Sequence, residues 1–203
     1  SPTSPNYIGG VKIDDLQTID PDTAGTLTLE NGGFGADMWL GTDRGVIEEL
    51  LPHLPVNASS NSMRDLMRRM LLSIARVPER GAKKSSLVAI RIRLLAAMGD
   101  VVSVNTLLNA TPGRASNSEL VRIETETRFL ANDNARACAL AGGIIRDQQN
   151  PFWKKVFLFC QALAGEHDKA SLGISIMRET GSKDDVFFSM IESLGSGTPA
   201  TLE

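Results

Sequence analysis

Aromatic residues, cysteine and histidine are scarce in this sequence. Aromatic side chains make up 5% of the 203 residues, and there are two cysteines and two histidines. Leu, Ala and Met are plentiful instead, which favours helices over a β-sandwich. No run approaches the roughly 18 consecutive apolar residues of a membrane span. A hydrophobic fraction of 42% excludes wholesale disorder.

Both ends of the chain have the composition of linkers. Ser1-Pro-Thr-Ser-Pro-Asn6 is rich in Pro and Ser, and Leu202-Glu203 is consistent with a cloning scar. We therefore expect a piece of a longer protein with three parts. These are an extended N-terminal segment or tether over 1–40, a helical repeat domain over 41–194, and a flexible tail or scar over 195–203.

From Thr42 onward the pattern is that of successive helices, whereas residues 1–40 show only a short strand-like alternation over 26–29 and a turn over 31–35. One apolar stripe starts after Ser60 and Ser62, two candidate caps, and Pro78 and Gly81 end it; its residues are Met63, Leu66, Met67, Met70, Leu71 and Ile74. Further helices are predicted over 85–98, 101–109, 117–131, 134–146, 151–164, 168–179 and 184–194.

The breaks between these helices recur at a fixed interval. Gly99, Asn132 and Gly165 are separated by 33 residues each. Gly and Asn adopt the left-handed conformation that ends a helix, and the acid after each break favours a new helix start. An apolar or small residue follows five positions after each break: Val104, Ala137 and Ala170. Periods of this size are typical of helical solenoids.

The segment Gly165-Glu-His-Asp-Lys-Ala170 resembles the junction of tetratricopeptide repeats, as do 132–137 and, more weakly, 99–104. The resemblance covers about 85–180, without the regular Trp, Tyr and Pro of the other signature positions. It implies a concave surface that holds a partner. The chain also resembles uncharacterised exported helical-repeat proteins of Alphaproteobacteria, which carry no known catalytic residues.

Motifs for catalysis or metal binding are weak. His53 stands between prolines and His167 beside a turn, and neither shares a pattern with Ser, Cys or Asp that indicates a triad. Asp20-Pro-Asp22 begins like a calcium loop, but its fifth position is Ala24 and its twelfth is Asn31. A turn explains this stretch better. The sequence therefore predicts no catalytic residue, metal or cofactor.

The Gly-rich stretch 31–37 is not a phosphate-binding loop, because no Lys-Ser/Thr follows it. We expect Phe34, Met38 and Trp39 to hold this loop against the first helical hairpin, with a recognition loop as the alternative. Two later helices are strongly apolar. The helix over 151–164 is apolar almost all round, which indicates burial on both sides or a groove for a partner's helix. The helix over 184–194 is expected to be the final helix and to cover the end of the helical array.

Charge is unevenly distributed within a total of −3: residues 1–59 carry a net −7 and residues 60–93 carry +7. The cations on the helix face opposite the apolar stripe, or in the loop after it, are Arg64, Arg68, Arg69, Arg76, Lys83 and Lys84. They form a solvated face covered in part by the acidic N-terminal segment, or a patch for an anionic partner. No aromatics interleave with them, which argues against nucleic acid. Together with Phe34 and Trp39 they are the candidate partner surface.

The two cysteines are predicted to form a disulfide. Cys138 lies 12 residues before Asn150 and Cys160 lies 10 after it. With a turn at Asn150-Pro151 and about 1.5 Å rise per residue, antiparallel helices place both at nearly the same height. Two cysteines that pair with none left over are typical of an oxidising compartment such as a periplasm. The alternative is two buried thiols in a cytoplasmic protein.

These patterns predict an all-α fold: a right-handed α-solenoid of about four helical hairpins after an extended N-terminal segment. The function hypothesis is a non-enzymatic scaffold or adaptor that binds another protein of the cell envelope, in the periplasm. A second hypothesis is the superhelical, non-catalytic part of a larger envelope enzyme, such as one acting on cell wall. A third is an intracellular nucleic-acid adaptor, whose binding would weaken steeply with salt.

Overall fold

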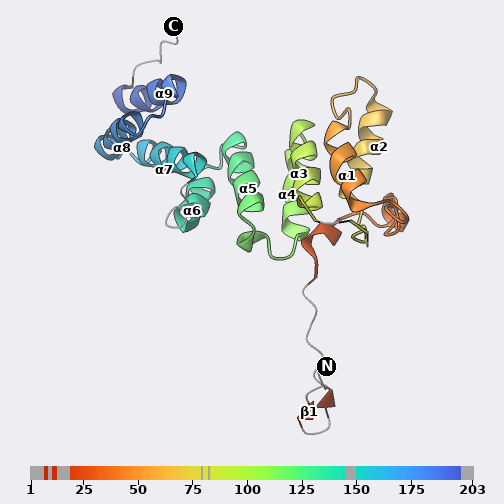
Figure 1. Ribbon diagram of the computed structural model, residues 1–203. Coiled ribbons are helices and arrows are strands. Elements are labelled where there is room, and N and C mark those ends of the chain that lie inside the picture. Colours follow the sequence, from red (N-terminus) through yellow and green to blue (C-terminus); the bar gives the residue numbers. More distant parts are fainter. Residues whose placement is uncertain are drawn as a thin grey trace. The chain divides into compact units, whose positions relative to one another are not determined.

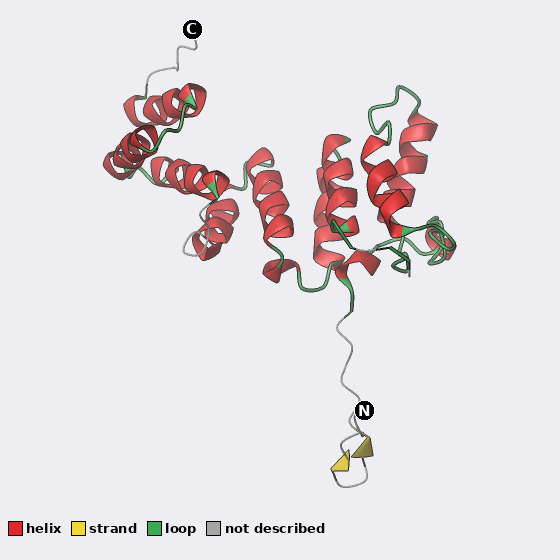
Figure 2. Cartoon of the chain, in the orientation of Figure 1, coloured by secondary structure: helices red, strands yellow, loops and turns green. Residues whose placement is uncertain are grey.

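The computed structural model describes residues 7–8, 11–12, 19–78, 80–81, 83–144 and 150–197. These residues are mainly α-helical, which confirms the predicted all-α class (Figure 1, Figure 2). Two short strands, β1 (Tyr7–Ile8) and β2 (Val11–Lys12), pair antiparallel. The predicted linker Ser1–Asn6 and the end of the tail, with Leu202-Glu203, lie outside the described residues.

The chain divides into two compact units at Arg114. The helices of the first unit are α1 (Arg44–Leu50), α2 (Asn61–Leu72), α3 (Leu87–Ala97) and α4 (Val101–Ala110), with the 3-10 helices η1 (Pro21–Thr23), η2 (Leu29–Asn31) and η3 (Leu51–His53). Here α3 is the central element: α2, α4, η1 and η3 pack against it, and seven of its eleven residues are buried.

The second unit begins within the 3-10 helix η4 (Arg114–Ser116). Its helices are α5 (Ser118–Leu130), α6 (Asn134–Ile144), α7 (Pro151–Leu163), α8 (His167–Glu179) and α9 (Asp185–Ser196). Each packs against the next, and α7 also packs against α9. The predicted bounds agree with these helices within about two residues. Residues 145–146 of one predicted helix lie outside the described part.

The three breaks at 33-residue intervals share one backbone geometry. Gly99, Asn132 and Gly165 have positive φ angles of 74°, 58° and 78°. At each break this residue's N–H donates to the carbonyl three residues earlier, and the next N–H donates to the carbonyl five earlier, at 2.8–3.1 Å. This pair of hydrogen bonds is the Schellman motif. The residues five positions later are all buried, as the close approach of the two helices requires.

Gly165→Val is expected to destabilise the second unit by about 1–2 kcal/mol. An added Cβ would meet nothing within 4 Å, so the whole cost is the left-handed backbone. Gly142→Val in α6 is the matched control, because it also has open space and no positive φ. Urea unfolding of both variants checks this; equal stability would show that the conformation of Gly165 is not what ends α7.

The predicted disulfide between Cys138 in α6 and Cys160 in α7 is present, with a Cα–Cα distance of 5.7 Å. Asn150 is the N-cap of α7, its side chain accepting the Phe152 N–H at 2.9 Å, and Pro151 is the first helical residue. Ala137 and Ala141 are fully buried beside Cys138. Small residues here allow the two helices to approach closely enough for the bridge.

Protein isolated from its native compartment is expected to have an intact mass two hydrogens below the reduced mass. Reduction should destabilise the second unit by about 3 kcal/mol, because the bridge closes a loop of 22 residues' separation. Non-reducing mass spectrometry and urea unfolding with and without reductant measure both effects. Two freely alkylated thiols in the native protein would contradict the prediction.

The predicted apolar faces are only partly covered, and one predicted helix end is wrong. Helix α2 ends at Leu72, not near Pro78, and Met63, Leu66 and Ile74 of its stripe are exposed. Helix α7 packs against α6, α8 and α9, as burial on both sides requires, but it is not covered all round, because Phe157 and Leu163 are about 40% exposed. Helix α9 packs against α7 and α8, as expected of the final helix; its Phe188 and Ile191 are buried, whereas Val186, Met190 and Leu194 are exposed. Periodicity identifies an apolar face but not whether another segment covers it.

Candidate functional site

Residues 19–48 fold onto α2, α3 and the extended residues that follow α2. The N–H groups of Thr26 and Leu27 donate to the Leu72 carbonyl at 2.8 and 3.0 Å, and the Ile74 N–H donates to Leu27 at 2.9 Å. Leu27 and Ser73 form an isolated parallel bridge. The strand expected over 26–29 is therefore reduced to this bridge, since η2 begins at Leu29.

A buried carboxylate fixes the start of this segment. Asp22 accepts hydrogen bonds from Arg44 at 2.6 Å, from Ser86 at 2.9 Å and from the Val88 N–H at 3.0 Å. Lys83 adds an ion pair at 3.1 Å, and Arg44 also pairs with Glu48 at 2.7 Å. The turn predicted instead of a calcium loop is therefore present as η1, and its acid joins the start of α3 to α1.

Asp22 should make the first unit sensitive to acid. Burial alone would raise the pKa of Asp22, but hydrogen bonds from Arg44, Val88 and Lys83 outweigh it and hold this pKa below the ordinary 3.8. A lowered pKa stabilises the fold above about pH 4, and this contribution is lost as the pH falls below it. Urea unfolding at a series of pH values measures this effect. The free energy of unfolding should fall less on acidification in Asp22→Asn than in the native chain.

The acid effect of Asp22 must be separated from that of other acids. The pKa of Asp100 is also lowered, with burial opposed by hydrogen bonds from Ser103 and Arg68. Asp100→Asn is therefore the comparison variant for the first unit. If the free energy of unfolding depends on pH as steeply in Asp22→Asn as in the native chain, the carboxylate of Asp22 does not link acid to unfolding.

Arg91 is a buried cation at the centre of the first unit. It is 1% exposed and donates to the carbonyls of Leu71, Ser73 and Ala24 at 2.7, 2.7 and 2.6 Å. Burial lowers the pKa of Arg91 to about 10, so the side chain stays charged at neutral pH. These three carbonyls belong to the end of α2 and to the segment before Gly25, so one guanidinium joins both to α3.

Most of the predicted basic face pairs within the chain. Arg68 bonds to Asp100 at 2.8 Å, Arg69 to the Gly32 carbonyl at 2.5 Å and Arg76 to Asp37 at 3.2 Å. Lys83 pairs with Asp20 and Asp22. Arg64 bonds to Asn61 on its own helix, and the backbone N–H of Lys84 to Glu48. The acidic N-terminal segment therefore covers part of this face, as one of the two interpretations expects.

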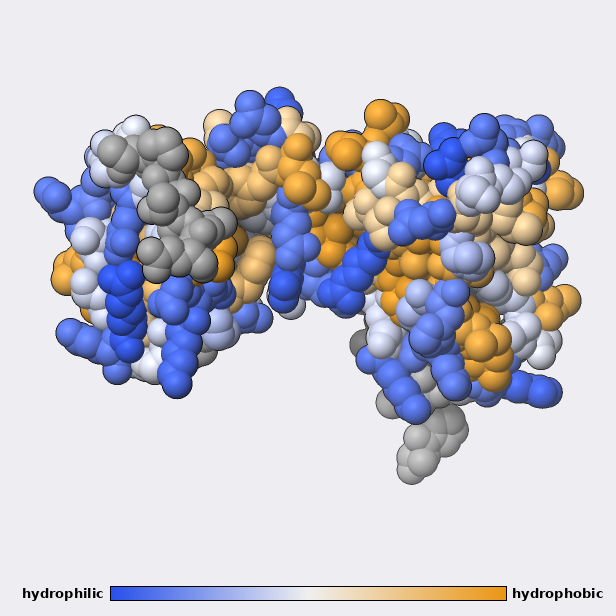
Figure 3. Space-filling view, turned by 90° about the horizontal axis from the view of Figure 1, so that it is seen from above, coloured by the Kyte–Doolittle hydropathy of each residue, from blue (hydrophilic) through white to orange (hydrophobic). Residues whose placement is uncertain are grey.

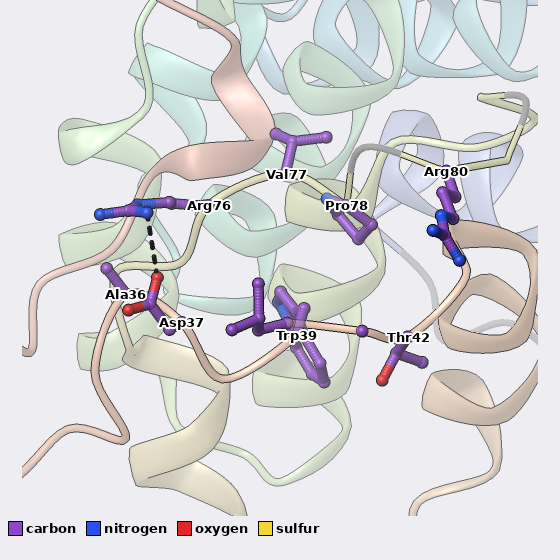
Figure 4. A pocket seen from close by; sticks show the side chains of 10 residues that line it. Ala36, Asp37, Trp39, Thr42, Arg76, Val77, Pro78 and Arg80 are labelled. Atoms are coloured by element: carbon purple, nitrogen blue, oxygen red, sulfur yellow. Dashed lines mark ion pairs between the residues drawn. The ribbon is translucent and has the colours of Figure 1, made fainter.

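Trp39 lies between η2 and α1 in the sequence and lines two open cavities. One, of about 300 Å³, is lined by Trp39, Thr42, Arg76, Pro78 and Arg80 among others (Figure 4). The second, of about 250 Å³, is lined by Met38, Trp39, Thr42, Val46, Ile47, Leu50, Leu51, Leu54 and Met70. In Figure 4, Trp39 lies below Pro78, with the Arg76–Asp37 pair and Arg80 on opposite sides of it.

Of the predicted partner surface, only Trp39 and Arg76 meet at these cavities. Phe34 lies elsewhere, with its N–H donating to Ser73 at 2.9 Å. The structure adds Arg80 and the exposed Val46 and Leu50 of α1. The (i, i+4) spacing of Val46 and Leu50 is the sequence signal for the latter pair. In the space-filling view, apolar residues gather among hydrophilic ones on both units (Figure 3).

No family model, curated protein or solved structure matches this chain. In the described residues, no three His, Cys, Asp or Glu side chains gather as metal ligands. None of the described helices is long and apolar enough to cross a membrane. His167, at the start of α8, borders an open cavity of about 220 Å³ with Asp168, Ser171 and Glu192, whereas His53 ends η3 and is exposed.

Proposed function

We propose that this protein is a non-enzymatic scaffold or adaptor that binds another protein of the cell envelope through the surface around Trp39. The observation that carries the proposal is the pair of cavities sharing Trp39 and Thr42. Trp, Met and Arg are enriched in the centres of protein interfaces. Here they lie beside the exposed apolar side chains of Leu40, Val46 and Leu50.

The cell envelope as location is supported by the disulfide of the second unit, because such bridges persist in oxidising compartments. The scaffold role is supported by the recurring helix breaks, which allow successive helices to pack pairwise. We propose that they build a right-handed solenoid of about four tetratricopeptide-like hairpins. Helical solenoids bind partners along extended surfaces.

Site-directed photo-crosslinking in the native organism tests the proposed surface. A photoreactive residue replaces Leu40, which is next to Trp39, or Leu130 in the second unit; both leucines are 82% exposed. We expect a discrete protein adduct from position 40 and none from position 130. No adduct at position 40, or the same adducts at both, would refute binding at this surface.

A further inference from the structure

The two cavities beside Trp39 differ in chemistry. The smaller one is lined by apolar side chains apart from Thr42, and Val46 and Leu50 stand at its rim 45% and 62% exposed. Its volume of about 250 Å³ is below the roughly 300–1,000 Å³ of pockets for drug-sized ligands. It therefore suits one large apolar side chain of a partner, with the adaptable Met38 and Met70 in its lining.

The larger cavity carries a net positive charge. Its charged lining residues are Asp37, Arg76 and Arg80. Asp37 and Arg76 pair at 3.2 Å and offset one another. The backbone carbonyl of Arg80 accepts the Arg44 N–H at 2.9 Å, which fixes the residue beside α1. Its exposed guanidinium has no ion pair with any residue that the structure describes, and such a group prefers a carboxylate.

Because both cavities share Trp39 and Thr42, a ligand that fills both has its two groups close together. We propose that this surface binds a partner segment in which an acidic residue stands beside a large apolar residue. The apolar side chain fills the cavity of Val46, Leu50 and Met70, and the carboxylate pairs with Arg80. The inference rests on the proposed function and specifies the chemistry of the partner.

Short labelled peptides test this directly by fluorescence polarisation with the full chain. The probe peptide contains Glu-Phe flanked by Gly and Ser, with both ends blocked. Two control peptides carry Gln in place of Glu or Ala in place of Phe. We expect the Glu-Phe peptide to bind at least tenfold more tightly than either. Equal affinities, or no binding of the probe at about millimolar concentration, would overturn the inference.

Two protein variants locate the effect. Arg80→Gln should abolish the preference for Glu over Gln and leave the dependence on Phe. Arg64→Gln, at an exposed cation on α2, should leave both preferences unchanged. A preference for Glu that persists in Arg80→Gln would refute the assigned residue. Crosslinking at position 40 without any preference for the Glu-Phe peptide would refute only this inference. Absence of crosslinking would contradict the proposed function itself.

Discussion

Gly25→Ala is expected to destabilise the first unit on the order of 3 kcal/mol. A Cβ at this position would lie 2.4 Å from the Ile74 nitrogen and 2.5 Å from the Ser73 carbonyl carbon. Both atoms are backbone, so no side chain can rotate away. To make room, the segment must separate from residues 73–74, which weakens the Leu27–Ser73 bridge and the bonds of Thr26 and Leu27 to Leu72.

Urea unfolding followed by tryptophan fluorescence measures this effect, because Trp39 lies in the first unit and Trp153 in the second. Gly142→Ala is the control: its Cβ would meet nothing within 4 Å, and alanine favours the helix by up to about 1 kcal/mol. An unfolding midpoint of Gly25→Ala equal to that of the native chain would refute the close approach of the two segments.

Arg91→Met should cost the first unit about 3 kcal/mol or more. Methionine fills much of the same volume but leaves the carbonyls of Leu71, Ser73 and Ala24 without their donor. Methionine avoids the cost of burying a charged group, and this offsets part of the penalty. The sum of three hydrogen bonds therefore overstates the loss of stability.

Arg93→Met is the matched control, since Arg93 lies two residues further along α3 and is exposed; its loss should stay below about 1 kcal/mol. Arg91→Lys keeps the charge but lacks the planar fork that reaches three acceptors, so an intermediate loss is expected. Equal stability of Arg91→Met and Arg93→Met would show that the buried guanidinium does not hold the segment before Gly25.

The candidate site was only partly predictable. The scarcity of aromatic residues and the charge distribution point to Trp39 and Arg76, and both line the cavity. The sequence marks Arg80 only as one cation of the basic stretch 60–93. Its place beside Trp39 depends on the path of the chain after α2, which turns back so that the Arg76 N–H bonds to Ala36 at 2.8 Å. No local pattern specifies that path.

The sequence alone determined the features that depend on near neighbours along the chain. Helix ends followed from caps such as Ser60 and Asn150 and from left-handed residues such as Gly165, because these act within one turn. The disulfide followed from the helical rise and the position of one turn. Each depends on distances of only a few residues or on a single helical hairpin.

Only the tertiary structure decided which side chains are buried and what they bind. Arg91 is at the centre of the first unit although it belongs to the basic stretch, and Phe157 is exposed although it belongs to an apolar helix. Asp22 bonds to groups 22 to 66 residues away. Burial depends on which distant segments pack together, and periodicity within one helix carries no information on that choice.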